Sequence, residues 1–239
     1  NMGVPGVALA TVIAQLFSAV LCVLKLSRMH DVFDFNLHMM KPRREYFRQL
    51  LRLGLPSGLT QVIFSLAMVT VQSLTNTFGE MIIACNVIVM RVDGFAMMPN
   101  FTFGMTMTTY AGQNVGAQKI ERVEWGTRQG LGIAVGVSTV ITIIILIFGR
   151  YLMNVFTGTK ALVDLSMRMM RILAMGYIAM AVTQVLSGVM RGAGDTVTPM
   201  WLSLLTTIFL RVPIAYGLAY LTRSPQYPRG RPESIFISL

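Results

Sequence analysis

The chain has 239 residues, of which 54% are hydrophobic and only 13% are charged, and its mean hydropathy is +0.63. A soluble domain of this length cannot bury so much apolar surface, so we expect a membrane protein. The net charge of +10 does not indicate a nucleic-acid partner, because the basic residues flank apolar runs and do not form one stripe.

Six apolar segments are long enough to cross a lipid core, which takes about 20 helical residues. In chain order they cover residues 2–24, 53–78, 82–110, 130–148, 169–190 and 199–221, and residues 235–239 open a further segment. The N-terminus has neither an initiator methionine nor the pattern of a cleaved signal, which predicts an internal piece of a longer protein. The expected fold class is an all-α integral membrane protein, a polytopic helix bundle.

The distribution of Lys and Arg predicts the orientation of these segments. Eleven basic residues fall on the side that holds the long segment 25–52, and six fall on the other side. The richer side is expected to face the cytoplasm. Two polar, glycine-bearing motifs lie on that same side, each directly after an apolar segment.

These two motifs are predicted to be tight cytoplasmic turns. The first reads Gly112-Gln113-Asn114-Val115-Gly116-Ala117, and the second reads Arg191-Gly192-Ala193-Gly194-Asp195-Thr196. Their glycines permit backbone conformations with positive φ. Asn114 and Asp195 are side chains that can cap a neighbouring helix end.

Three charged residues lie deep inside the apolar segments. Arg91 and Asp93 are in the third segment, and Arg211 is in the sixth. A charge at such a depth costs about 2.5–3.5 kcal/mol, so each should face protein or water. Arg91 and Asp93 point to different sides of a helix and cannot neutralise each other. We hypothesise that Asp93 pairs with Arg211 or, as a second candidate, with Arg91, either as a structural ion pair or in coupling to transport.

Polar residues recur at helical spacing along the second, third and fifth segments, which predicts inward-facing polar faces. Such faces line a cavity or hydrogen-bond neighbouring helices. The 19 methionines suit either irregular packing or an adaptable apolar site. We expect a substrate and ion pathway lined by Gln61, Met68, Gln72, Asn86, Arg91, Asp93, Asn100, Tyr177, Gln184 and Arg211. Pro56, Pro99 and Pro213 are expected to kink or hinge their helices.

Taken in order, the motifs resemble the bacterial multidrug and toxic compound extrusion family over nearly the whole chain. The motif at 112–117 is similar to the loop after the eighth helix of that family, and residues 187–200 are similar to the loop after its tenth. Residues 53–58 resemble the start of the seventh helix, and residues 3–11 resemble the start of the sixth. Arg91-Val92-Asp93, with residues 96–99, resembles the eighth helix of a bacterial branch.

The resemblance implies a division of the chain. Residues 1–24 would be the last helix of an N-terminal lobe, residues 25–52 a basic cytoplasmic loop between lobes, and residues 53–239 most of a second, C-terminal six-helix lobe. It further implies a secondary active exporter of the bacterial inner membrane, without catalytic residues or resident metal. Its partners would be the lipid bilayer, small amphiphilic cationic drugs and the missing N-terminal lobe.

The coupling ion is left open between H⁺ and Na⁺. Some members of the family carry sodium-binding carboxylates on the seventh and tenth helices, whereas residues 53–78 and 169–190 contain no Asp or Glu. A lipid-linked oligosaccharide flippase is one alternative, which would require a more cationic cavity. A membrane enzyme or an inactive piece is the other, but the chain shows no nucleophile with a base, no metal-spaced cluster and no phosphate loop.

Overall fold

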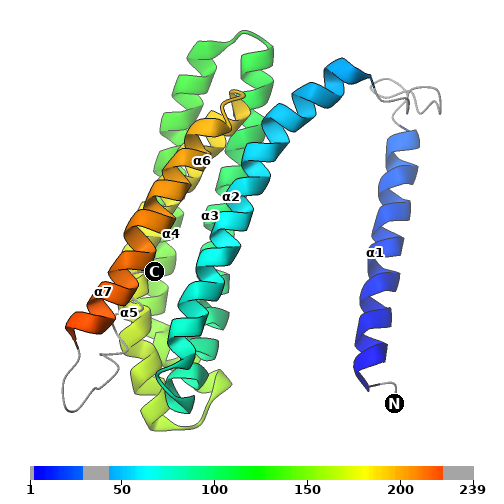
Figure 1. Cartoon of the computed structure of the whole chain (residues 1–239). Coiled ribbons are helices and arrows are strands. Elements are labelled where there is room, and N and C mark those ends of the chain that lie inside the picture. The colour runs from blue at the N-terminus through cyan, green and yellow to red at the C-terminus, as the bar shows by residue number, and fades with distance from the viewer. Residues whose placement is uncertain (1–2, 29–42, 223–239) are drawn as a thin grey trace. The chain divides into compact units, whose positions relative to one another are not determined.

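The computed structural model describes residues 3–28 and 43–222, and the regular structure within them is helical (Figure 1). The helices are α1 (Gly3–Ser27), α2 (Arg44–Asn76), α3 (Glu80–Gly116), α4 (Ile120–Phe156), α5 (Lys160–Gly192), α6 (Val197–Leu204), the π-helical η2 (Leu205–Arg211) and α7 (Val212–Leu221). The last three run on as one rod, Val197–Leu221, so six described helices are long and apolar enough to cross a membrane. The predicted all-α bundle is confirmed. Residues 235–239 lie outside the described part.

The chain divides into two compact units, Asn1–Leu50 and Leu51–Leu239. In the first unit, α1 is an apolar helix whose side chains are largely exposed and whose last turn carries Lys25. An exposed apolar surface of this kind suits lipid or another protein surface. The second unit contains the residues that the sequence analysis assigned to a pathway.

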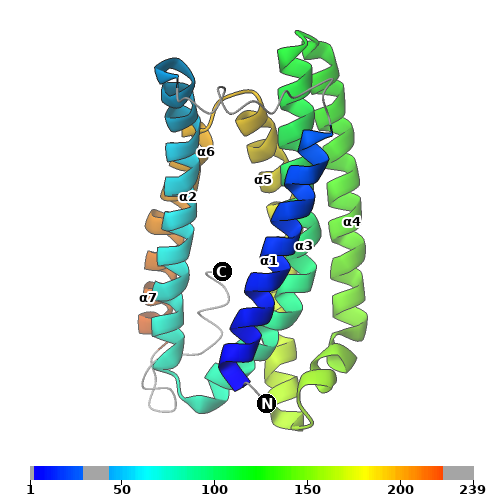
Figure 2. The same cartoon turned by 90° about the vertical axis from the view of Figure 1, so that its right-hand side faces the viewer.

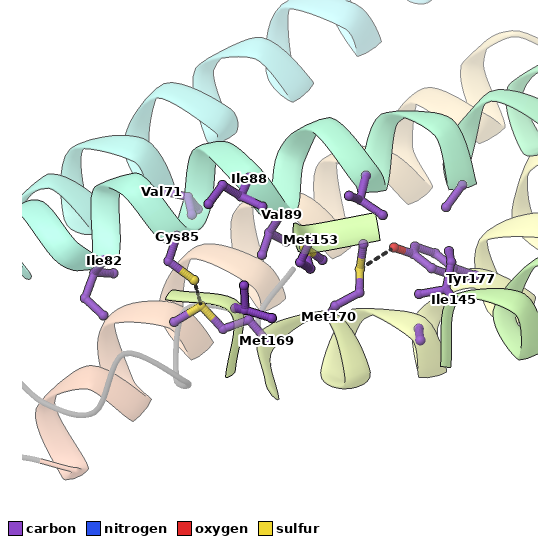
Figure 3. Close-up of a cluster of buried hydrophobic side chains, with 14 residues drawn as sticks. Val71, Ile82, Cys85, Ile88, Val89, Ile145, Met153, Met169, Met170 and Tyr177 are labelled. Atoms are coloured by element: carbon purple, nitrogen blue, oxygen red, sulfur yellow. Dashed lines mark hydrogen bonds between the residues drawn. The ribbon is translucent and has the colours of Figure 1, made fainter. Parts of the chain in front are cut away.

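The core of the second unit lies among α3, α4 and α5, which pack against one another (Figure 2). One cluster of buried side chains includes Cys85, Val89, Met153, Met169 and Met170 (Figure 3). A smaller cluster joins Met107, Ala134, Ala181 and Val185. Methionine fills irregular spaces well, and at least part of the chain's methionine content therefore serves packing.

The helices extend beyond the apolar segments predicted from hydropathy. α2 begins at Arg44, inside the predicted loop 25–52, and α3 continues through the first glycine motif to Gly116. The α3–α4 turn is closed by a hydrogen bond from the Lys119 N–H to the Asn114 carbonyl (2.9 Å), with Gln118 at φ 59°. The predicted turn at 112–117 therefore lies too early in the chain: residues 112–116 are still helical, and the left-handed residue is Gln118.

The second glycine motif forms the same kind of turn. Arg191 and Gly192 still belong to α5, and the Asp195 N–H donates to the Met190 carbonyl (2.9 Å). Gly194 takes the left-handed conformation, at φ 91°, which is the usual place for glycine after a helix. Both turns lie at the same end of the bundle, as the sequence predicted (Figure 1).

A proline explains the π-helical segment. Pro213 has no N–H to donate, and its ring crowds the carbonyl one turn earlier. The helix widens over Leu205–Arg211 and resumes as an α-helix at Val212, with Pro213 as the second residue of α7. Arg211, one of the predicted pathway residues, is the last residue of the widened segment.

Candidate functional site around Asp93

Helices α3 and α5 run parallel with a constant register. Cys85 Sγ lies 3.1 Å from Met169 Sδ, and Asp93 contacts Tyr177; each pair is 84 positions apart. Gly104 and Gly188 face each other at the same separation, and a Cβ on Gly188 would stand 2.3 Å from the Gly104 carbonyl oxygen. This register determines which side chains of the two helices meet.

Asp93 is half-buried and accepts a hydrogen bond of 2.8 Å from the hydroxyl of Tyr177. Tyr177 itself is only 3% exposed. Its hydroxyl also lies 3.2 Å from Met170 Sδ (Figure 3). The side-chain amide of Asn100 donates to the Tyr177 backbone carbonyl at 3.3 Å. The tyrosine is thus held from both ends, and its phenol reaches the carboxylate across the helix interface.

The predicted ion pair between Asp93 and Arg211 is not formed. Among the described residues, ion pairs within 4.0 Å join Arg128 to Glu124 and Arg150 to Asp164. Arg211 is half-buried, and its guanidinium lies 3.8 Å from Met68 Sδ, a weak acceptor. Its Nε is buried without a hydrogen-bond partner in the described part of the chain. Attraction between Arg211 and Asp93 acts at longer range.

Two amides connect α2 to α3 about two helical turns before Asp93. Asn86 Nδ2 donates to Gln72 Oε1 at 3.1 Å, and Gln72 Nε2 donates to Asn76 Oδ1 at 2.9 Å. Asn86 is buried, and its amide also lies 3.6 Å from Met90 Sδ. The Asp93 carboxylate thus contacts Tyr177 of α5, and Asn86, about two helical turns earlier on α3, contacts Gln72 of α2.

The other predicted pathway residues divide between exposed positions and helix interfaces. Gln61 and Arg91 are exposed, and Arg91 lies two residues before Asp93, on a different side of α3. Asn100 is 1% exposed and lies between α3 and α5. The backbone of Gln184 packs against Gly104. Asn100 thus acts as a contact between helices, which was the second of the two interpretations of the polar faces.

In the two turn motifs, only the second contains a helix cap. Asp195 Oδ1 accepts hydrogen bonds from the N–H groups of Val197 (3.1 Å) and Thr198 (3.0 Å), so its predicted capping role is confirmed. Asn114 instead donates its side-chain amide to the Tyr110 carbonyl at 2.8 Å, within its own helix. Gln113 is exposed on the last turns of α3.

The sequence analysis named both Tyr177 and Asp93 but did not pair them, and it did not single out Met170. The missing information was the register of α3 against α5, because helical spacing shows which residues share a face and not which residue of another helix they meet. The described residues contain no group of three or more His, Cys, Asp or Glu side chains that could hold a metal ion.

The MatE family model matches residues 56–217. The chain is 27% identical over 226 residues to the probable multidrug resistance protein YoeA of Bacillus subtilis, covering 93% of this chain and 49% of that protein. It is 24% identical to the probable multidrug resistance protein NorM of Thermotoga maritima, over 90% of this chain and 46% of the relative. The chain thus spans about half the length of the curated relatives it matches.

Solved structures of MATE transporters have a similar fold. A crystal structure of MATE in the straight conformation has a TM-score of 0.87 at 22% identity, covering 100% of this chain and 52% of that one. The outward-facing conformation of a multidrug resistance MATE family transporter gives 0.84 at 23% identity, covering 98% and 52%. Because the family model matches more than half of the residues, the chain belongs to the multidrug and toxic compound extrusion (MATE) family of multi-pass membrane transporters.

Proposed function

We propose that the chain forms the C-terminal half of a secondary active exporter, which exchanges H⁺ or Na⁺ for amphiphilic organic cations by alternating access of two lobes. The observation that carries the proposal is the half-buried carboxylate of Asp93 among the neutral polar and thioether side chains of a MATE-family fold. An ionisable residue at this depth of a membrane helix marks an ion or substrate pathway by default.

The chemistry around Asp93 suits substrates that differ in shape. Met68 and Met90 are 41% and 44% exposed, so their flexible thioethers are available for apolar contacts. Gln72 adds an amide, and Asp93 adds the negative charge that an organic cation requires. A site with few polar groups and adaptable apolar ones favours breadth over tight selectivity.

The proposed exporter requires a second lobe, in keeping with relatives of about twice the length. Within this half, the interlocked α3 and α5 would move as one body when the lobes rock. The expected location is the bacterial inner membrane, since the curated relatives named above are bacterial proteins. The multidrug resistance in their names is the basis for proposing cationic drugs as substrates of the whole protein.

The test is drug efflux by the whole transporter in everted membrane vesicles. Asp93→Asn should lower efflux of a fluorescent cationic dye at least about tenfold at equal expression, a loss of about 1.4 kcal/mol of interaction or more. Asp164→Asn is the matched control, because this exposed carboxylate pairs with Arg150 at the α4–α5 end, and its efflux should stay within about twofold. Unchanged efflux by Asp93→Asn would remove Asp93 from the pathway.

A further inference from the structure

The hydroxyl of Tyr177 has two acceptors and one proton. It lies 2.8 Å from Asp93 Oδ1 and 3.2 Å from Met170 Sδ, both within hydrogen-bond reach. A phenol can donate only one hydrogen bond at a time, although its oxygen can also accept one. The two contacts are therefore alternatives, and the choice between them depends on whether Asp93 is a carboxylate or a carboxylic acid.

In each protonation state of Asp93, the hydrogen-bond donors of this group can all find an acceptor without movement of the backbone. When Asp93 is ionised, Tyr177 donates to Oδ1. When Asp93 takes up a proton on Oδ1, the acid O–H donates to the phenol oxygen, and the phenol O–H turns to Met170 Sδ. The group thereby gains one proton and loses one negative charge. The O–H groups of Asp93 and Tyr177 each keep an acceptor, whereas an unpaired buried donor would cost about 1–3 kcal/mol.

The same surroundings disfavour a metal cation. Hard cations are held by several oxygen ligands. Near Asp93, Tyr177 supplies one oxygen that is already hydrogen-bonded, and Met170 supplies a soft sulfur. Arg211 also brings a positive charge toward the carboxylate, which would repel a second cation.

The other charged residues near this site are few. Those of α4 lie near its two ends, at residues 121–128 and 150, and the only charged residue of the described rod Val197–Leu221 is Arg211. α2 contributes uncharged Met68 and Gln72. On α5, Arg168 and Arg171 are exposed, and on α3 Arg91 is exposed on a different side from Asp93. Asp93 is thus the one carboxylate in the apolar parts of the described α3 and α5.

We infer that Asp93, Tyr177 and Met170 form a proton-binding site that accepts H⁺ and excludes Na⁺. The inference rests on the proposed function for its role, as the site that couples export to proton entry. The tyrosine is a positioning residue: it holds the carboxylate and exchanges its hydrogen-bond partner as the proton arrives.

Infrared difference spectroscopy of the whole transporter in lipid tests this site without requiring transport. Acidification should produce a carboxylic-acid C=O band that is absent from Asp93→Asn. The band should remain in Tyr177→Phe and Met170→Leu but change position, because the hydrogen bond to the phenol or its outlet to the thioether is lost. Tyr216→Phe and Met175→Leu, at exposed positions, are the matched controls and should leave the band unchanged.

A second experiment tests whether Na⁺ binds at this site. Replacing K⁺ by Na⁺ at fixed pH should leave the band unchanged, and an imposed pH gradient, not a Na⁺ gradient, should drive dye export. A band that Na⁺ abolishes, or one that persists in Asp93→Asn, would overturn the inference. If Asp93→Asn does not fold, a band that does not respond to Tyr177→Phe would overturn it too. An Asp93 band without any dye export would contradict the proposed exporter and leave the proton site standing.

Discussion

Gly188 of α5 packs directly against the backbone of α3 at Gly104: a Cβ on Gly188 would lie 2.3 Å from the Gly104 carbonyl oxygen. Farther along, a Cβ on Gly192 would lie 2.4 Å from the Thr108 carbonyl oxygen. Small residues at four-residue spacing let two membrane helices approach closely and gain dispersion contacts. The close approach fixes the register that brings Tyr177 to Asp93.

Gly188→Ala should therefore destabilise the transporter. The added methyl group meets backbone that cannot rotate away, and overpacking of this kind costs about 1–3 kcal/mol. Gly176→Ala is the matched control on the same helix, since its Cβ would meet nothing within 4 Å. It should be neutral or stabilising by up to about 1 kcal/mol, as alanine favours helix. Thermal unfolding of the whole transporter in detergent measures both, and equal melting temperatures would contradict the close packing.

The hydrogen bond between Asn86 and Gln72 should couple α2 to α3 measurably. In membrane proteins such bonds contribute about 0.6 kcal/mol on average and up to about 1.7 kcal/mol. A double-mutant cycle with Gln72→Leu and Asn86→Leu should give a coupling energy in that range. Gln61→Leu, on the exposed part of α2, should show no coupling to Asn86→Leu. Additive effects at 72 and 86 would mean that the bond does not contribute to stability.

The sequence predicted the six helices because lipid requires long apolar segments, and this pattern is local. It underestimated their lengths because hydropathy marks the apolar part of a helix, whereas α3 continues through Gly112 and Gly116 to a turn fixed by Gln118. The helix ends depend on backbone hydrogen bonds such as that of Lys119, which composition does not reveal.

The candidate site could be predicted as a set of residues but not as a set of contacts. Helical spacing placed Asp93 and Asn100 on one face of α3, and Tyr177 on a similar face of α5. It could not distinguish the pairing of Asp93 with Tyr177 from pairing with Arg211, because the choice depends on the register that Gly104 and Gly188 impose. The π-helical shift before Pro213, which sets the place of Arg211, is also invisible in hydropathy.

Exchanging glycine and non-glycine residues should have opposite effects on stability in the α3–α4 turn and in the α5–α6 turn. The left-handed residue is Gln118 (φ 59°) in the α3–α4 turn and Gly194 (φ 91°) in the α5–α6 turn. A left-handed conformation costs a residue with a Cβ roughly 1–2 kcal/mol. Gln118→Gly should therefore raise stability by about 1 kcal/mol, and Gly194→Ala should lower it by about 1–2 kcal/mol. Thermal unfolding compares them, and a loss of stability in Gln118→Gly would show that its side chain compensates for the strain.

The cap at Asp195 should make the start of α6 sensitive to acid. Hydrogen bonds from Thr198, through its side chain and its backbone N–H, and from the Val197 N–H hold the pKa of Asp195 below its ordinary value. A lowered pKa in the folded state means that the carboxylate stabilises this turn above the unfolded pKa, about 3.9. That contribution should disappear as the pH falls through the lower folded pKa, because the protonated acid is a poorer acceptor.

Hydrogen exchange at Val197 and Thr198, corrected for the intrinsic pH dependence of the exchange rate, measures this effect. Protection of the two amides should fall with acidification in the wild type. In Asp195→Asn it should be independent of pH over the same range, because asparagine caps helices but does not titrate. Asp195→Ala should lack the protection throughout. Identical pH profiles for the wild type and Asp195→Asn would show that the carboxylate's charge does not hold the first turn of α6.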